Sequence, residues 1–136
     1  MIQGAKDSLD TVVKSTTTFG DTNTFVDYQK TVNTYPHCFI KLKNDSIDDV
    51  GPAETQHILT FRLIVVMQGT GVEANLNSII GYVGEIVDAI EADRDLSNAR
   101  VLRTEVRNVS YTDRELQSFV QYYAHLDVEV ELLRNV

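Results

Sequence analysis

Three observations predict that the chain folds as one α+β domain. Apolar residues between positions 76 and 92 recur at the spacing of a helix. In several other segments, apolar and polar residues alternate as in strands. The length of 136 residues is typical of one domain. Read along the chain, the elements follow the order α-β-β-β-α-β-β, without an internal repeat. We therefore expect one domain over 1–136, whose mostly antiparallel or mixed sheet packs against the long helix 76–92 and an N-terminal helix.

The first helix is predicted over residues 2–14 because its apolar residues share one face. These residues are Ile2, Ala5, Leu9, Val12 and Val13. The polar stretch 15–24 is expected to form a loop. Residues 25–32 could form a first strand, which the segment "NTYP" ends.

Two strands are predicted in the middle of the chain, with an acidic loop over 44–54 between them. The first covers 38–43, where Cys38, Ile40 and Leu42 share a half-buried face. The second covers 55–68 and lines one face with Leu59, Phe61, Leu63, Val65 and Met67. Its other face carries Thr60 and Arg62, then Ile64 and Val66. We therefore expect the first half of this strand to expose one face to solvent and its second half to be buried on both faces.

The helix over 76–92 is the clearest element, because its apolar residues form a continuous stripe. They are Leu76, Ile79, Ile80, Val83, Ile86, Val87 and Ile90, and the segment "ADRDLSN" ends the helix. Two long strands are then predicted, over 100–111 and 118–133, joined by a hairpin turn at "TDRE". Arg103, Glu105 and Arg107 share one face of the first strand. In the second strand, Val120, Tyr122, Ala124, Leu126, Val128, Val130 and Leu132 alternate with Tyr123, His125, Asp127, Glu129 and Glu131.

The charge of the chain argues against binding to nucleic acid or to an anionic membrane. There are 20 acidic and 12 basic residues, which gives a net charge of −8. The most basic feature, Lys41 and Lys43, is typical of solvated lysines. The first ten residues lack the apolar segment of a signal peptide, and the run from Leu63 to Met67 is too short to span a bilayer. Cys38 is the single cysteine, which excludes an internal disulfide and favours a reducing cytosol or a particle assembled there.

The stretch "GTGVEA", Gly69 to Ala74, matches the G-x-G-x-x-A pattern of dinucleotide-binding loops and lies between a strand and a helix. Glu73 would stand in the first turn of the helix, where it would repel a pyrophosphate. A better account is a capping box. In this motif the Thr70 hydroxyl accepts from the Glu73 backbone N–H, and the Glu73 carboxylate accepts from that of Thr70. We therefore expect no cofactor here, although a small ligand-binding module that uses this turn remains an alternative.

No other pattern predicts catalysis or metal binding. His37 and Cys38 are neighbours in a strand, so they point to opposite faces and cannot act as a base and its nucleophile. His37, His57 and His125 are scattered, without the spacing of a zinc site. The run Asp45, Asp48, Asp49 lacks the glycine and the final glutamate of a calcium loop. We expect a protein that is not an enzyme and has no cofactor or metal.

The order of elements resembles that of the tail terminator, or tail completion, proteins of tailed bacteriophages. The matching segments cover nearly the whole chain: "SLDTVVK", "TYPHCFIKL", "NDSIDDVGPAE", "HILTFRLIVVM", "LNSIIGYVGEIVDAIEADRDL", "VLRTEV" and "YYAHLDVEVELL". In that family an N-terminal helix is followed by an aromatic-Pro segment, a long loop and a long strand, then by one major helix and two closing strands. No functional motif of the family is transferred to individual residues here.

The resemblance implies a homohexameric ring in the virion, assembled in the host cytoplasm. Such a ring caps the tail tube, and its partners are the tail tube protein and a neck or connector protein. Alternatives are another neck component, such as a head-completion protein, or a dimeric module that pairs strands at its edges. If a ring forms, the loop 44–54 and the wet face of the last strand are expected to contribute contacts. The candidate interface residues are Asp48, Asp49, Glu129 and Glu131.

Overall fold

The computed structural model describes residues 2–16, 18–20, 24–26, 35–51, 54–69, 72–115 and 120–135. Two helices and five strands occur in these residues, in the order predicted from the sequence. They are α1 (Ile2–Lys14), β1 (Thr24–Val26), β2 (His37–Gly51), β3 (Glu54–Gly69), α2 (Val72–Ala92), β4 (Val101–Glu115) and β5 (Val120–Asn135). The α+β fold class is therefore confirmed.

The five strands form one mixed sheet in the order β1-β2-β3-β5-β4. β1 runs parallel to β2, and the three other pairings are antiparallel. The pairing of β3 with β5 is continuous from Glu54 opposite Asn135 to Gly69 opposite Val120. β3 and β4 have the same direction but are separated by β5. The unit β3-α2-β4 is thus a split β-α-β unit, without the adjacent parallel strands of a dinucleotide-binding fold.

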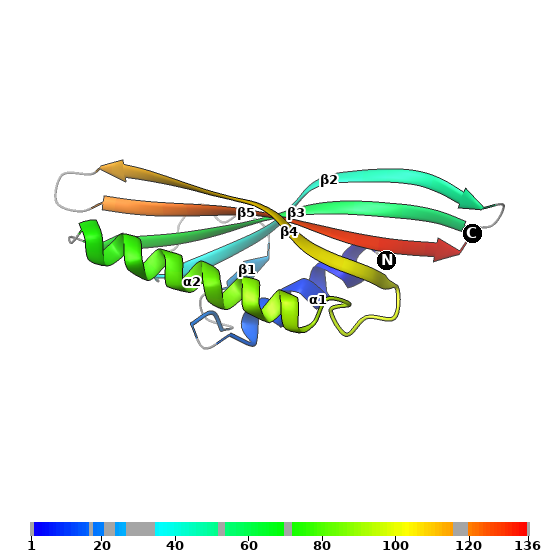
Figure 1. The fold of residues 1–136 in the computed structure, drawn as a ribbon, viewed down its shortest axis with the longest axis horizontal. Coiled ribbons are helices and arrows are strands. Elements are labelled where there is room, and N and C mark those ends of the chain that lie inside the picture. Colours follow the sequence, from blue (N-terminus) through cyan, green and yellow to red (C-terminus); the bar gives the residue numbers. More distant parts are fainter. Residues whose placement is uncertain are drawn as a thin grey trace.

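Both helices pack against one face of the sheet (Figure 1). The core between them takes Leu9 and Val13 from α1 and Ile79, Ile86 and Ile90 from α2. The strands supply the alternating residues that the sequence predicted, and the ones that are fully buried include Cys38, Ile40, Leu59, Phe61, Leu63, Val65, Ala124, Leu126, Val128, Val130 and Leu132. Burial raises the pKa of the Cys38 thiol, and the nearby Asp10 carboxylate raises it further. Cys38 is therefore an unreactive core residue.

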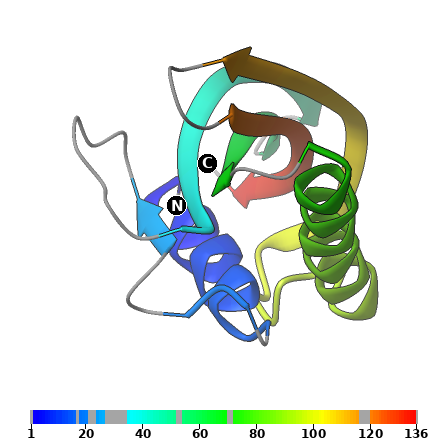
Figure 2. The ribbon, with the colours of Figure 1, turned by 90° about the vertical axis from the view of Figure 1, so that its left-hand side faces the viewer.

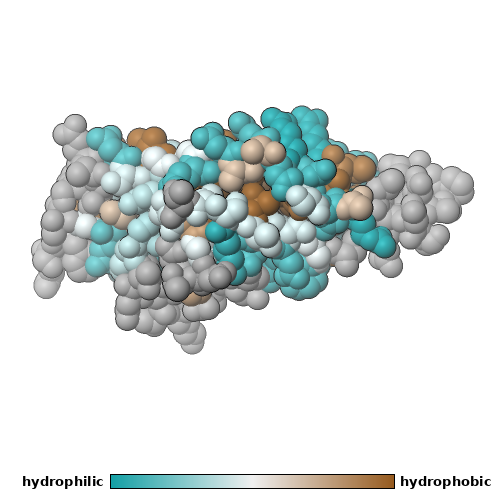
Figure 3. Space-filling model, turned by 90° about the horizontal axis from the view of Figure 1, so that it is seen from below, coloured by the Kyte–Doolittle hydropathy of each residue, from teal (hydrophilic) through white to brown (hydrophobic). Residues whose placement is uncertain are grey.

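Helix α2 begins at Val72, four residues before the predicted start, and its buried stripe is narrower than the sequence suggests. Ile79, Val83, Ile86 and Ile90 are buried, but Ile80 is 49% exposed. Leu76 is also exposed. Ile80 directly follows the buried Ile79, and successive residues of a helix point about 100° apart, so both cannot face a sheet that covers one side of the helix. Seen from the helix side, the hydrophobic surface residues lie in separate small areas (Figure 3).

The turn after α2 follows the segment that was predicted to end the helix. The Asp93 carboxylate accepts hydrogen bonds from the Ser97 backbone N–H, at 3.1 Å, and from the Ser97 hydroxyl, at 2.9 Å. Leu96 and Ser97 have positive φ values of 53° and 51°. The buried Leu96 side chain anchors this left-handed turn to the core. The proposed capping box at the other end of α2 lies outside the described residues, which include neither Thr70 nor the Glu73 side chain.

The prediction of a loop over 44–54 is wrong, because β2 continues to Gly51 and β3 begins at Glu54. Pairing with β3 holds this acidic segment in a strand, with Asp45 opposite Leu59 and Ile47 opposite His57. The register shifts between Leu42 and Asn44, and this bulge changes which residues of β2 face the helices. Composition alone favoured a loop, and the cross-strand hydrogen bonds override it.

Two other boundaries also differ from the sequence prediction. "TDRE" is not a turn, because β4 continues through Glu115 and pairs that residue with Val120. The described part of the first strand is Thr24–Val26, which starts one residue before the predicted start, and residues 27–34 lie outside the described part of the chain. Both antiparallel hairpins are therefore longer than predicted.

The sheet is strongly twisted and also curved. Viewed along its length, the strands turn strongly from one end of the sheet to the other, and the ends of β2 and β4 that overlap in this view lie at opposite ends of the sheet (Figure 2; compare Figure 1). On the face opposite the helical layer, residues of β2 and β4, which are not neighbours in the sheet, line one groove.

We predict that the two sides of helix α2 contribute very differently to stability. Ile86→Ala removes a fully buried side chain, and should lower the free energy of unfolding by about 2–5 kcal/mol. Ile80→Ala, on the half-exposed side, should cost about 1 kcal/mol or less. Urea unfolding of both variants measures the difference, and equal losses would contradict the described orientation of the helix.

Candidate functional site: the open face of the sheet

The sheet face opposite the helices carries most of the polar and charged strand residues, and no described helix covers it. We call it the open face. Its residues include Phe39, Lys41, Lys43, Thr60, Arg62, Ile64, Val66, Arg103, Glu105, Arg107, Asn108, Ser110, Thr112, Arg114, Gln121, Tyr123, His125, Asp127, Glu129 and Glu131. Along the strands it divides into a charged half and a half with an apolar floor.

An ion cluster around Asp127 lies at the middle of the open face. Arg62 stands directly opposite Asp127 in the β3–β5 register, and its Nε donates to Asp127 Oδ1 at 3.0 Å. Lys43 Nζ, from the bulge in β2, donates to Asp127 Oδ2 at 3.3 Å. The hydrogen bond from Arg62 lowers the pKa of Asp127, and the one from Lys43 acts in the same direction, although burial opposes both. The cluster thus ties three strands together through one ionised carboxylate.

A second cluster relieves the repulsion between two glutamates. Glu105 of β4 stands directly opposite Glu129 of β5. The Arg107 guanidinium binds both, with its Nη2 2.7 Å from Glu105 Oε2 and its Nε 2.7 Å from Glu129 Oε2. Arg107 lies at the register shift between Val106 and Asn108, and Arg103 also forms an ion pair with Glu105. The bulge therefore places a cation where the regular ladder would leave like charges facing each other.

The other half of the open face forms a groove of about 540 Å³ between β2 and the end of β4. This volume is within the range of ligand and peptide sites. Phe39, Ile64 and Val66 form an apolar floor, as predicted for the end of β3 that is buried on both sides. The described residues that line the groove include two cations, Lys41 and Arg114, and no acid.

His125 also lines this groove. Its Nδ1 is buried and has no hydrogen-bond partner among the described residues. Burial lowers the pKa of His125, and the Arg62 charge lowers it further, while Asp127 acts in the opposite direction. The ring is therefore uncharged at neutral pH and can offer a hydrogen bond to a group that enters the groove.

The two other histidines are held by structural contacts. His37 is buried against aromatic rings, with ring centroids 5.0 Å from both Tyr35 and Phe39. It lies on the opposite face of β2 from Cys38, as the strand alternation predicted. His57 Nδ1 is 3.1 Å from Asp45 Oδ1. In the part of the chain that the structure describes, no group of three potential ligands is placed to hold a metal ion.

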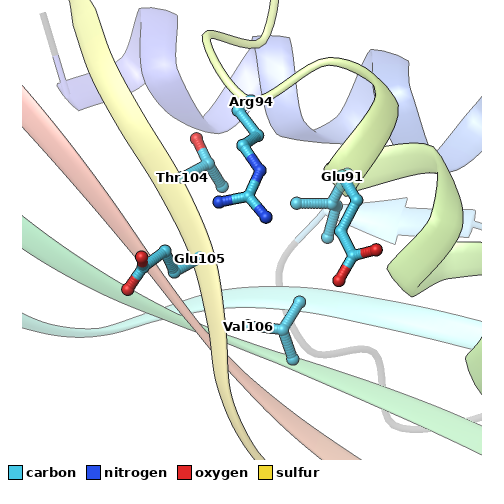
Figure 4. Close-up of a pocket in the computed structure, with 6 residues that line it drawn as sticks. Glu91, Arg94, Thr104, Glu105 and Val106 are labelled. Carbon is cyan, nitrogen blue, oxygen red and sulfur yellow. The ribbon is translucent and has the colours of Figure 1, made fainter.

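A smaller hollow of about 250 Å³ lies between the end of α2 and β4. Arg94 points into it from the turn after the helix, with Glu91 and Thr104 on either side, while the Glu105 carboxylate points away (Figure 4). The Thr104 hydroxyl is buried and has no partner among the described residues. The lining lacks the nucleophile with an adjacent base that covalent catalysis requires.

The four predicted interface residues lie in the same half of the sheet but play different roles. Along β3, Asp49 and Asp48 stand opposite Thr55 and Gln56, and Glu131 and Glu129 opposite Ile58 and Thr60. Asp48 and Asp49 lie in strand β2, and their side chains lie outside the described part. Glu129 is bound to Arg107 within the chain, whereas Glu131 has no ion pair among the described residues.

Sequence reasoning missed the groove and both ion clusters. Arg62 and Asp127 are 65 residues apart, and only the β3–β5 register makes them neighbours. The sequence did contain one signal for this site. Along one face of β3, the polar residues Thr60 and Arg62 are followed by the apolar Ile64 and Val66, and this change marks the boundary between the two halves of the open face.

We predict that Asp127 makes the chain less stable in acid. Because its pKa is lowered in the folded state, Asp127 stabilises the fold above its unfolded pKa of about 4 and loses this effect as the pH falls below it. Asp127→Asn should therefore reduce stability at pH 7 and flatten its decline in acid. Unfolding between pH 2.5 and 7 measures this, with Asp113→Asn, an exposed position on β4, as the control. The same acid profile for both variants would contradict the role of the cluster.

We predict that Arg107→Gln destabilises the fold by about 0.5–1 kcal/mol, because Glu105 and Glu129 then face each other without a shared cation. Adding Glu105→Gln should recover part of this loss, since only one charge remains at the pair. A double-mutant cycle by urea unfolding at low and high salt measures the coupling. A coupling that salt leaves unchanged would argue against an electrostatic origin.

Three comparisons with known proteins complete the description. No protein-family profile matches the chain, and no curated protein matches its sequence. Among solved structures, the fold is similar to a chain of a structure titled "Virion of native gene transfer agent (GTA) particle", with 13% identity, a TM-score of 0.47, and 90% of this chain and 84% of that chain covered. A likeness at this level describes a similar course of the chain and assigns no function.

The described helices include none that is long and apolar enough to cross a membrane.

Proposed function

We propose that this protein is a structural virion protein that forms a ring at the head-proximal end of a phage tail. In this role it ends polymerisation of the tail tube and provides a surface for joining the neck. The proposal begins from the resemblance in element order to tail terminator proteins, and from a fold class that agrees with that order. It includes no catalytic activity, cofactor or metal.

The observation that carries the proposal is that both edges of the sheet are long and lack partners among the described residues. β1 pairs with Cys38–Ile40, so the outer side of β2 from Lys41 to Gly51 has no strand partner among the described residues. At the other edge, β4 is unpaired on its outer side over Val101–Glu115. Natural monomers usually shorten, charge or cover such edges, because free strand edges associate. A neighbouring subunit would cover them here.

Exposed apolar side chains on these edge strands favour the same conclusion. Ile47 is 59% exposed and Leu42 is 42% exposed on β2. Leu102 and Tyr111 are exposed on β4. The two edges have different sequences, so contact between them in neighbouring copies is head-to-tail, the type that closes into rings.

The partners of the ring in this proposal are the tail tube protein and a neck or connector protein. The acidic chain suits a channel through which DNA passes without adhering, because like charges repel. Sequence-specific binding to nucleic acid and binding to a membrane are not part of the role. The main rival is another neck component, which would also form a ring but would not stop tube growth.

We predict that the protein forms a particle of about 92 kDa, six times the 15.3 kDa chain, and that it stops elongation of tail tube subunits in vitro. Light scattering with negative-stain imaging measures the ring, and tube lengths with and without the protein measure the arrest. A ring that leaves tube lengths unchanged would favour the rival neck role. A monomer at every concentration, with or without tubes, would refute the ring.

Charge reversal on β5 tests the predicted interface residues in the same assay. Glu129→Lys with Glu131→Lys should reduce the ring mass. Glu131→Lys alone is the cleaner variant, because Glu129 also binds Arg107 within the chain. Glu91→Lys, which makes the same charge change at an exposed position of α2, is the matched control. An unchanged ring mass in the β5 variants would remove this face from the interface.

A further inference from the structure

We propose that the groove on the open face receives the β2–β3 hairpin of a neighbouring copy of this chain, with Ile47 entering the apolar floor. The contact rests on the proposed ring, for which it would supply the subunit interface. Four features of the described residues lead to it.

The first feature is the charge of the groove. Lys41 and Arg114 line it, and neither forms an ion pair with another described residue. None of the described lining residues is acidic, although the chain as a whole carries a net charge of −8. The nearest acid on the open face, Asp127, is already bound by Arg62 and Lys43. The groove is therefore a cationic site that an acidic segment would neutralise.

The second feature is the composition of the hairpin. Its segment 44–54, "NDSIDDVGPAE", contains four acidic residues and no basic one. In the sequence, Ile47 stands between Asp45 and Asp48, and its side chain is 59% exposed. A second copy of the chain thus brings both the negative charge and the apolar group that the groove would take.

The third feature is the position of the two surfaces. The groove floor lies at Phe39 and Ile64, which are register partners, whereas Ile47 pairs with His57. Ile47 lies eight positions after Phe39 in β2, which corresponds to about 26 Å along the strand. A hairpin therefore cannot reach the groove of its own chain, and contact between copies continues head-to-tail.

The fourth feature is that the groove can satisfy polar groups as well as charge. The buried His125 Nδ1 lacks a partner among the described residues. Burial without a hydrogen bond is costly for such an atom. A backbone or side-chain group of the entering hairpin would provide the missing bond, while Phe39, Ile64 and Val66 cover Ile47.

Disulfide trapping between two singly substituted proteins tests this contact. One protein carries Ile47→Cys and the other, with a size tag, carries Thr112→Cys on the groove wall. After mild oxidation of the mixture, we expect a mixed dimer on a non-reducing gel. Cys38, the natural cysteine, is buried. Oxidation of the unsubstituted protein therefore measures the background level of disulfide dimer. The matched control is Asn108→Cys, on the same strand and face but about 13 Å away, which should give at least tenfold less mixed dimer.

Charge reversal separates a specific contact from random collision. Lys41→Glu with Arg114→Glu in the Thr112→Cys protein should reduce the mixed dimer at least tenfold. Asp48→Lys with Asp49→Lys in the Ile47→Cys protein should restore it. Equal trapping at Thr112 and Asn108, or no effect of charge reversal, would overturn the inference, as would the absence of a mixed dimer.

The result can be distinguished from a failure of the proposed function. If the wild-type protein forms the ring and arrests tubes but no mixed dimer is trapped, the ring uses another interface and only this inference fails. If the mixed dimer forms with the expected charge dependence but tubes grow without arrest, the contact is real and the tail role fails.

Discussion

The pairing of β3 with β5 is the constraint on which the rest of the structure depends. This antiparallel ladder is continuous over the full length of both strands, so it fixes which residues share a face from one end of the sheet to the other. A shift of β5 by one residue against β3 would exchange the core and open residues of β5. Leu126 would then leave the helical layer, and Asp127 would enter it. The apolar alternation on both strands excludes that shift energetically, because burying the charged set is costly.

The register also explains how one sheet face serves two purposes. Next to the Arg62–Asp127 pair, the open face is a network of ion pairs held by Lys43 and Arg107. Both of these cations lie at register shifts of the outer strands. The bulges thus adjust the edges of the sheet around an unbroken centre. Beyond Ile64 the same face has an apolar floor and forms the groove, so a half cross-linked by ion pairs adjoins a half that is suited to receiving another surface.

The free edges and the concave groove give the proposed assembly a physical basis. β2 and β4 are the outer long strands of the twisted sheet (Figure 2), and both contribute residues to the groove on the side away from the helices. The groove lies near one end of this curved surface, and the acidic hairpin lies near the other. Surfaces of opposite character at opposite ends of one chain favour contacts between successive copies over contacts that pair identical faces. A ring would satisfy both surfaces in every subunit.

The sequence by itself determined the element order, the two helices, and the inward residues of β3 and β5, because these follow from periodic burial. The sequence also located the point along β3 where the residues of the open face change from polar to apolar. Only the tertiary structure decided that 44–54 is a strand, that Ile80 and Leu76 are exposed, and that Arg107 separates Glu105 from Glu129. Local composition at Asp45 or Thr112 favours a turn, and cross-strand hydrogen bonds with distant residues override that preference. The groove likewise depends on the curvature of the whole sheet, which brings Lys41 and Arg114 together from strands that do not pair with each other.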